Sequence, residues 1–246
     1  QDNLPHGKIC VCFTPDEEIG HGAALLDLEK FGASYAYTVD GGAPNEVEWE
    51  TFYAAAADWS IAGVSVHPGD AKDKMVNAAL VAMEINGMLP PDEIPAKTQG
   101  REGFFHLCDM SGDVSAAKLS YIIRDHDAEK FSQRKQTMRE IERKINETYG
   151  AGTAALTLRE QYRNMAEILQ HHPDVVEQAK RAIRAVGLTP VSTPVRGGTD
   201  GAQLSFRGLP CPNLGTGAYA LHGPYEHAIA EQMDVMTEIL LHIAQA

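Results

Sequence analysis

A strand–helix–strand pattern near the beginning of the chain limits the folds that this sequence can adopt. Residues 8–14 (KICVCFT) form a short apolar run that is typical of a β-strand, and residues 34–39 form a second one. The segment between them has helical periodicity and ends at Gly32, a residue type that commonly stops helices. Two strands joined by a helix are expected to be parallel, with a right-handed crossover. The pattern therefore predicts an α/β domain built on a parallel sheet.

Acidic residues follow both of these predicted strands. Glu17 and Glu18 lie in the segment TPDEEIG after the first strand, and Asp40 begins the segment DGG after the second. Ligands of parallel sheets gather beyond the carboxyl ends of the strands, so the three side chains are expected at one edge. Carboxylates there suit a divalent cation, with one acid left over to carry protons. The combination predicts a metal-dependent hydrolase.

Each acidic segment also has a simpler interpretation when it is taken alone. Glu17 and Glu18 suit a solvated turn that begins a helix, because acids are favoured in a first helical turn. The segment DGG suits a tight turn, because glycine tolerates positive φ. The coincidence of acids at two neighbouring strand ends is what favours the metal site.

The character of the sequence changes at about residue 51, where a second predicted module begins. Its elements are a loosely alternating segment (51–66), a helix (72–88), two strands (103–109 and 113–125), a charged amphipathic helix (128–148) and a strand (153–160). This order is that of a ferredoxin-like α+β module with an antiparallel sheet. Helices are predicted again near 174–186 and 229–244. We predict one α/β domain, made of residues 1–51 and 165–246, that is interrupted by an inserted module, residues 52–164.

Charge and cysteine content exclude several classes of partner and location. The net charge is −13 and no Lys/Arg cluster offsets it, which argues against a nucleic-acid partner. No apolar run approaches the length that spans a membrane, so no membrane partner is expected. The four cysteines fit neither a disulfide framework nor a zinc-finger spacing. Free thiols of this kind predict a reducing, cytoplasmic location.

Two of the ten histidines are distinctive because of their positions. His222 follows an apolar segment and a glycine-flanked loop in the α/β part, and imidazole commonly joins carboxylates at zinc. His67 lies in the segment VHPG, at the predicted exit of a strand in the inserted module. Taken alone, that setting favours an ordinary turn histidine.

Two arginines are candidates for binding a substrate carboxylate. Arg124 ends an apolar run, and Arg196 lies beside a pair of glycines. The guanidinium group offers a bidentate fork that suits the C-terminal carboxylate of a peptide. A salt bridge to a neighbouring acid, Asp125 or Asp200 respectively, is the alternative for each.

Several longer segments, in order, carry a family resemblance. TPDEEIG and YTVDGG are followed by VSVHPGDAKDKMVNA, YIIRDHD and RGGTDGAQLSFRGLPCPNLGTGAYALHG. Together they closely resemble tripeptide aminopeptidases of the peptidase T type. These belong to the di-zinc metallopeptidase family that includes aminoacylase-type and carboxypeptidase G-type enzymes. The resemblance implies a zinc-exopeptidase-like catalytic domain with an inserted dimerisation or lid domain. It also implies two zinc ions per intact site and release of the N-terminal residue from tripeptides through a metal-bound hydroxide.

The resemblance also implies roles for individual residues. Glu17 resembles the general base, Glu18 a ligand of one zinc, Asp40 a ligand of the other zinc, and His222 a ligand from a terminal loop. In the inserted module, His67 matches a histidine that reaches the active site of a second subunit in a homodimer and supports the oxyanion. Arg124 and Arg196 match positions that are implied in binding the substrate carboxylate.

The chain departs from this family at its beginning. Family members carry a long stretch before this point, with a histidine ligand and a metal-bridging aspartate for which the sequence has no candidate. We therefore expect the chain to resemble the C-terminal part of such an enzyme, and expect it alone to bind zinc poorly and to hydrolyse little. The alternatives are another amidohydrolase of the family, such as a dipeptidase or deacylase, and a fragment that is competent only for dimerisation.

Overall fold

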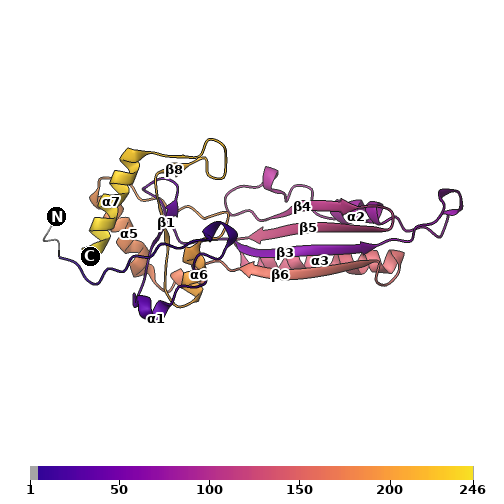
Figure 1. Ribbon diagram of the computed structural model, residues 1–246, viewed down its shortest axis with the longest axis horizontal. Coiled ribbons are helices and arrows are strands. Elements are labelled where there is room, and N and C mark those ends of the chain that lie inside the picture. Colours follow the sequence, from indigo (N-terminus) through magenta and orange to yellow (C-terminus); the bar gives the residue numbers. More distant parts are fainter. Residues whose placement is uncertain (1–4, 246) are drawn as a thin grey trace. The chain divides into compact units, whose positions relative to one another are not determined.

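The computed structural model describes residues 5–245, and its contacts divide the chain into two compact units (Figure 1). The chain up to Thr51 and from Arg163 onward forms the first unit. Phe52–Tyr162 forms the second unit. Among the described residues, no helix is both long enough and apolar enough to cross a lipid bilayer.

The first unit contains a three-stranded mixed sheet. Its strands lie in the order β1 (Thr38–Gly41), β7 (Asn213–Gly215) and β2 (Val47–Glu48). The central strand β7 is parallel to β1 and antiparallel to β2. Parallel pairing is therefore present, but between strands far apart in the sequence. The α/β class that the sequence predicts for this part of the chain is confirmed.

The strand predicted at residues 8–14 is not formed. This segment has no regular secondary structure, and its side chains Ile9, Val11 and Phe13 are 55, 73 and 93% exposed. A strand is stabilised by a pairing neighbour and by burial of one face, and residues 8–14 have neither within the described part of the chain. The helix predicted to follow is reduced to a single 3₁₀ turn, η1 (Glu17–Ile19), and a short helix, α1 (Leu28–Phe31). Gly32 does end α1, with φ of 64°.

Two long helices cover the sheet of the first unit. The helices α5 (Pro173–Ala185) and α7 (Ala230–Ala244) confirm those predicted near 174–186 and 229–244. They share a core with the sheet, in which the buried side chains are Val47, Val176, Ala179, Ala182, Ile183, Leu214, Met236 and Ile239. The shorter elements of this unit are α4 (Ala166–Leu169), α6 (Asp200–Phe206), β8 (Ala218–Tyr219) and β9 (His227–Ala228). The strands β8 and β9 pair with each other in an antiparallel hairpin-like ribbon.

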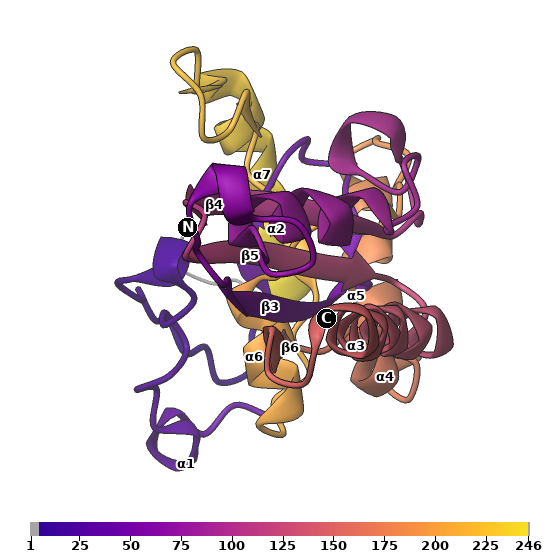
Figure 2. The ribbon, with the colours of Figure 1, turned by 90° about the vertical axis from the view of Figure 1, so that its right-hand side faces the viewer.

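The second unit has the ferredoxin-like order that the sequence predicts. Its elements are β3 (Tyr53–Ala62), α2 (Ala78–Gly87), β4 (Phe104–Gly112), β5 (Ala116–Asp125), α3 (Ala128–Tyr149) and β6 (Ala154–Tyr162). The strands lie in the order β4–β5–β3–β6, and every neighbouring pair is antiparallel. Short 3₁₀ turns, η2 (Pro68–Asp70) and η3 (Pro95–Lys97), lie in the connections. Figures 1 and 2 show α2 and α3 on the same face of this sheet.

Alternation along the strands explains how this sheet packs. Trp59 and Ile61 of β3 and Leu119 of β5 are buried in one cluster with side chains of α2 and α3. Asp58, directly before Trp59 in the sequence, takes the other face and accepts hydrogen bonds from the Ser120 hydroxyl and the Arg159 guanidinium. The helix α2 begins later than predicted because Asn77 caps it, accepting from the backbone N–H groups of residues 79 and 80.

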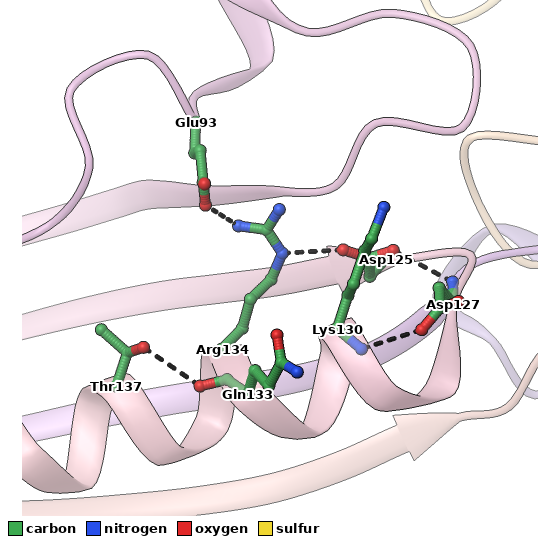
Figure 3. A network of polar contacts seen from close by, with 7 residues as sticks. All are labelled: Glu93, Asp125, Asp127, Lys130, Gln133, Arg134 and Thr137. Atoms are coloured by element: carbon green, nitrogen blue, oxygen red, sulfur yellow. Dashed lines mark hydrogen bonds and ion pairs between the residues drawn. The ribbon is translucent and has the colours of Figure 1, made fainter.

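A partly buried arginine joins three parts of the second unit (Figure 3). The Nε atom of Arg134, on α3, donates to Oδ2 of Asp125 at 2.9 Å, and its Nη1 atom pairs with Glu93. Asp125 is 1% exposed, and its second oxygen accepts from the backbone N–H of Asp127. The guanidinium group also lies over the ring of Phe105, 5.1 Å from its centroid. This network ties the connection after α2 and the end of β5 to helix α3.

Candidate active site

Glu17 and Glu18 occupy a tight turn rather than the start of a long helix. Asp16, before them, has φ of 63°, and Gly20, after them, has φ of 75°. The backbone N–H of Gly20 donates to the carbonyl of Glu17 at 2.7 Å and so closes the turn. Both acids therefore project from one 3₁₀ turn, with Glu17 half-buried and Glu18 exposed. The two neighbouring carboxylates therefore lie in different surroundings, that of Glu17 partly shielded from solvent and that of Glu18 open to it.

His222 comes from a distant part of the sequence and reaches the turn that bears Glu17 and Glu18 (the acidic turn, residues 16–20). Its Nε2 atom lies 3.0 Å from Oε2 of Glu18, and both side chains are 75% exposed. His222 has φ of 60°, a left-handed conformation that is uncommon for residues other than glycine. Its backbone N–H donates to Oε2 of Glu226 at 2.8 Å, which holds the loop between β8 and β9 in this shape. The imidazole is thus presented to the carboxylate by a strained loop.

The charges of these side chains influence one another. Burial raises the pKa of Glu17, and repulsion from Asp40, Asp200 and Glu18 raises it further, while His222 acts in the opposite direction. The pKa of Asp40 is raised by partial shielding from solvent, then by Glu18 and Asp200, with His222 again opposing. Four acids and one imidazole therefore share one local field. A cation placed among them would relieve the repulsion.

The donor types in this cluster suit a borderline divalent cation. A carboxylate and an imidazole already lie within contact distance of each other, and a second carboxylate, Asp40, lies within their electrostatic reach. Zinc sites use three or four protein ligands. Within residues 5–245, no group of three or more His, Cys, Asp or Glu side chains is arranged to hold a metal ion. The described side chains therefore fit zinc in type and supply an adjacent pair of donors, but they do not form a complete coordination shell.

Asp200 is a component of the site that the sequence interpretation missed. It begins α6, is 3% exposed, and accepts from the Thr14 hydroxyl at 2.9 Å and from the Ala23 N–H at 3.0 Å. These contacts join the two sides of the acidic turn. The sequence alone indicates Asp200 only as an alternative salt-bridge partner for Arg196. Its position directly after Thr199, which caps α6 by accepting from residue 202, was the signal for a helix start.

Asn213 and Glu48 support the strand that carries Asp40, and neither was predicted. The Nδ2 atom of Asn213, on the central strand β7, donates to the backbone carbonyl of Asp40 at 3.2 Å and to Oε2 of Glu48 at 2.6 Å. Asn213 is 1% exposed, so these contacts are inside the sheet of the first unit. They hold the end of β1, where Asp40 projects.

The remaining predicted residues are divided between the two units. Arg196 belongs to the first unit, where it is half-buried in the segment before α6. His67 and Arg124 belong to the second unit. The Nδ1 atom of His67 accepts from the backbone N–H of Gly69 at 3.1 Å. The structure thus brings Glu17, Glu18 and His222 together with Asp40, and places His67 and Arg124 on separate elements of the other unit.

Arg124 does not form the alternative salt bridge with its neighbour Asp125. Its Nη1 atom donates to the backbone carbonyls of Ala55 and Ile123, and its guanidinium lies over the ring of Tyr162, 5.3 Å from the centroid. Asp125 pairs with Arg134 instead. Arg124 is therefore held on β5 by backbone and aromatic contacts.

The first unit is thus an α/β fold that gathers acids and an imidazole beside the end of a strand. The model of peptidase family M20/M25/M40 matches residues 1–246, and the chain belongs to this family. Peptidase T from Clostridium perfringens is 50% identical to it over 240 residues, which are 98% of this chain and 59% of that relative. The chain thus spans 59% of the length of this curated relative.

Solved structures of the family have the same fold. The aminopeptidase PepT from Bacillus cereus matches with a TM-score of 0.81 and 25% identity, over 94% of this chain and 62% of that one. A dinuclear metal binding peptidase from Bacillus subtilis matches with a TM-score of 0.68 and 17% identity, over 95% of this chain and 63% of that one. These matches confirm the α/β fold.

Proposed function

We propose that the whole protein is an aminopeptidase that releases the N-terminal residue from tripeptides. The observation that carries this proposal is the contact between Glu18 and His222 beside Glu17 and Asp40, which gathers donors and a proton carrier at one place. The 50% identity to peptidase T of Clostridium perfringens supports the same substrate class.

We propose that Glu18, Asp40 and His222 would hold zinc, with two ions in each complete site. The mixture of carboxylate and imidazole donors supports this, as does the dinuclear metal binding described for the Bacillus subtilis peptidase of the same fold. Zinc bound there would polarise the scissile carbonyl and promote the ionisation of water. The chain itself contributes the two exposed donors, Glu18 and His222, already positioned against each other.

In this proposal Glu17 is the general base. It lies next to a candidate ligand but is more buried than Glu18, so its carboxylate remains available to accept a proton from water and to deliver it to the leaving amine. Burial and neighbouring acids raise the pKa of Glu17. A carboxylate with a raised pKa is a stronger base and is better suited to take a proton from water.

Three further residues would act on the substrate in the same proposal. Because Nδ1 of His67 accepts a hydrogen bond from Gly69, the ring proton of the neutral imidazole is on Nε2, which suits donation to an oxyanion. Arg124, whose guanidinium is oriented by two carbonyls and an aromatic ring, and Arg196 would bind the substrate carboxylate. We also propose that the second unit mediates a homodimer and serves as a lid, and that the protein acts in the cytoplasm.

A substrate panel tests this function. The whole protein, loaded with Zn²⁺, is incubated with tripeptides, N-acetylated tripeptides, dipeptides and acyl amino acids, and the released amino acid is quantified. We expect cleavage of tripeptides with a free N-terminus and none of their acetylated forms. Preference for dipeptides or acyl amino acids would reassign the protein as a dipeptidase or a deacylase. A zinc-free dimer by sedimentation, inactive on the whole panel, would favour a role in dimerisation alone.

A further inference from the structure

One face of helix α6 is polar and is directed at the acidic turn. This face carries Asp200 and Gln203, and Arg207 follows at the C-terminal end of the helix. The intervals of three and four residues place all three side chains on the same side. Each of the three makes a hydrogen bond to the segment 14–26, which contains Glu17 and Glu18. The segment therefore meets a continuous row of polar side chains.

Asp200 holds this segment at two points that flank the acids. Its Oδ2 atom accepts from the hydroxyl of Thr14 and its Oδ1 atom accepts from the N–H of Ala23. The backbone passes so close at Gly22 that a methyl group there would lie 2.1 Å from Oδ2 of Asp200. Glycine at this position is what permits the contact. Burial of a carboxylate is unfavourable unless its oxygens accept hydrogen bonds. The donors from Thr14 and Ala23 therefore allow Asp200 to be buried.

Gln203 and Arg207 hold the remainder of the segment. The Nε2 atom of Gln203 donates to the carbonyl of Gly20 at 2.9 Å, directly after the turn that bears Glu17 and Glu18. The guanidinium of Arg207 donates to the carbonyls of Ala23 and Leu26. The contacts from α6 thus run in order along the segment, from its beginning to its end.

The segment has little regular structure of its own. It contains one 3₁₀ turn of three residues, Glu17–Ile19, and the next helix begins only at Leu28. Leu25, within the segment, is 95% exposed and contributes no core packing. Ala23 is fully buried and, with Leu26, packs in a cluster that includes Leu204 of α6. The conformation of the segment is therefore determined by its polar contacts with α6 together with this packing.

We propose that α6 is the positioning element of the acidic turn, and that Gln203 sets the placement of Glu17 through the carbonyl of Gly20. This inference rests on the proposed function, since it concerns the placement of the general base and of a metal ligand. Gln203 touches neither substrate nor metal in this account. It acts through the backbone, as a positioning residue. A displacement of a catalytic group by about 1 Å is enough to lower a rate by up to about a hundredfold.

The test compares two isosteric substitutions in the same unit. Gln203→Met removes the donor to Gly20 and keeps the length of the side chain. Gln178→Met is the matched control, because Gln178, on α5, also donates to a backbone carbonyl, but to that of Ile243 on helix α7. For both variants, hydrogen exchange of residues 14–26 is measured by mass spectrometry, and kcat and KM are measured on a tripeptide.

We expect faster exchange of residues 14–26 in Gln203→Met only, together with a kcat lower by roughly tenfold or more and a KM within about twofold of the wild type. Unchanged exchange in Gln203→Met, an equal loss of kcat in both variants, or faster exchange with an unchanged kcat would each overturn the inference. The variants are made in the whole protein, and if the whole protein without a substitution does not cleave tripeptides, the proposed function fails. The exchange comparison then decides by itself whether α6 positions the turn.

Discussion

The Nε2 atom of His222 lies 3.0 Å from Oε2 of Glu18, at the surface of the first unit. Both side chains are 75% exposed, and a polar contact between two such exposed side chains contributes little to stability. Its cost is visible in the backbone, because His222 adopts a left-handed conformation to make the contact. A strained residue that gains little stability from its contact is typical of a functional site.

Removal of this imidazole is therefore expected to weaken metal binding more than folding. For His222→Asn in the whole protein, we predict a loss of Zn²⁺ affinity of about tenfold or more, measured by competition with a chromogenic chelator. His227→Asn is the control, since His227 lies in the same region, on β9, and stacks on Tyr219. Equal Zn²⁺ affinity in the His222 variant and the wild type would remove His222 from the ligand set.

Glu17 is predicted to be needed for turnover but not for the metal. In Glu17→Gln, the side chain keeps its size and loses the ability to accept a proton, so tripeptide hydrolysis should fall by about a hundredfold or more. Zinc content, measured by atomic absorption, should persist. Glu29→Gln, an exposed glutamate on α1 of the same unit, controls for the loss of one charge. A loss of zinc in Glu17→Gln would show that Glu17 is a ligand instead.

The parts of the fold that were predicted correctly depend on local patterns. The helix α3 and the strands β3 and β5 carry their amphipathic or alternating periods within a single segment, so their order is visible in the sequence. The strand predicted at 8–14 failed for the opposite reason. Its residues have a strand-like pattern, but a strand also needs a partner, and no local pattern identifies that partner.

The candidate site was predictable in its residue types and not in its supports. Acids after apolar runs and a glycine-flanked histidine can be recognised one segment at a time. Asp200 supports Thr14, and Asn213 supports Asp40, from the opposite end of the sequence. Such contacts arise only when the chain is folded. The pairing of Arg134 with Asp125, in place of the neighbouring Arg124, has the same origin.

Glu48 is predicted to make stability decrease as pH rises. Burial raises its pKa above the ordinary value of 4.5, and the hydrogen bond from Asn213 only partly opposes this. The folded state then binds the proton more tightly than the unfolded state. Its stabilising effect is complete below pH 4.5 and is lost as pH rises through the folded pKa. Relative to the wild type, Glu48→Gln should therefore become more stable between about pH 4 and pH 7, as measured by urea unfolding.

The control for this pH dependence is again Glu29→Gln, which removes the same charge at an exposed position. Its stability relative to the wild type should change less over the same range. If the stability difference between Glu48→Gln and the wild type does not change with pH, burial of Glu48 does not perturb its titration.

Arg134 is predicted to be the most important charged side chain of α3 for stability. Its side chain is 12% exposed, and its guanidinium neutralises Asp125, which is 1% exposed (Figure 3). Arg134→Met leaves a buried carboxylate without its charged partner, and we expect a loss of about 3–5 kcal/mol in the free energy of unfolding. Arg143→Met, on the same helix, breaks an exposed pair with Glu147, in which both side chains are 60% exposed, and should cost less than about 1 kcal/mol. Urea titration followed by circular dichroism measures both. Equal losses in the two variants would contradict the prediction, because the pair of Arg134 with the buried Asp125 would then contribute no more to stability than the exposed pair of Arg143 and Glu147.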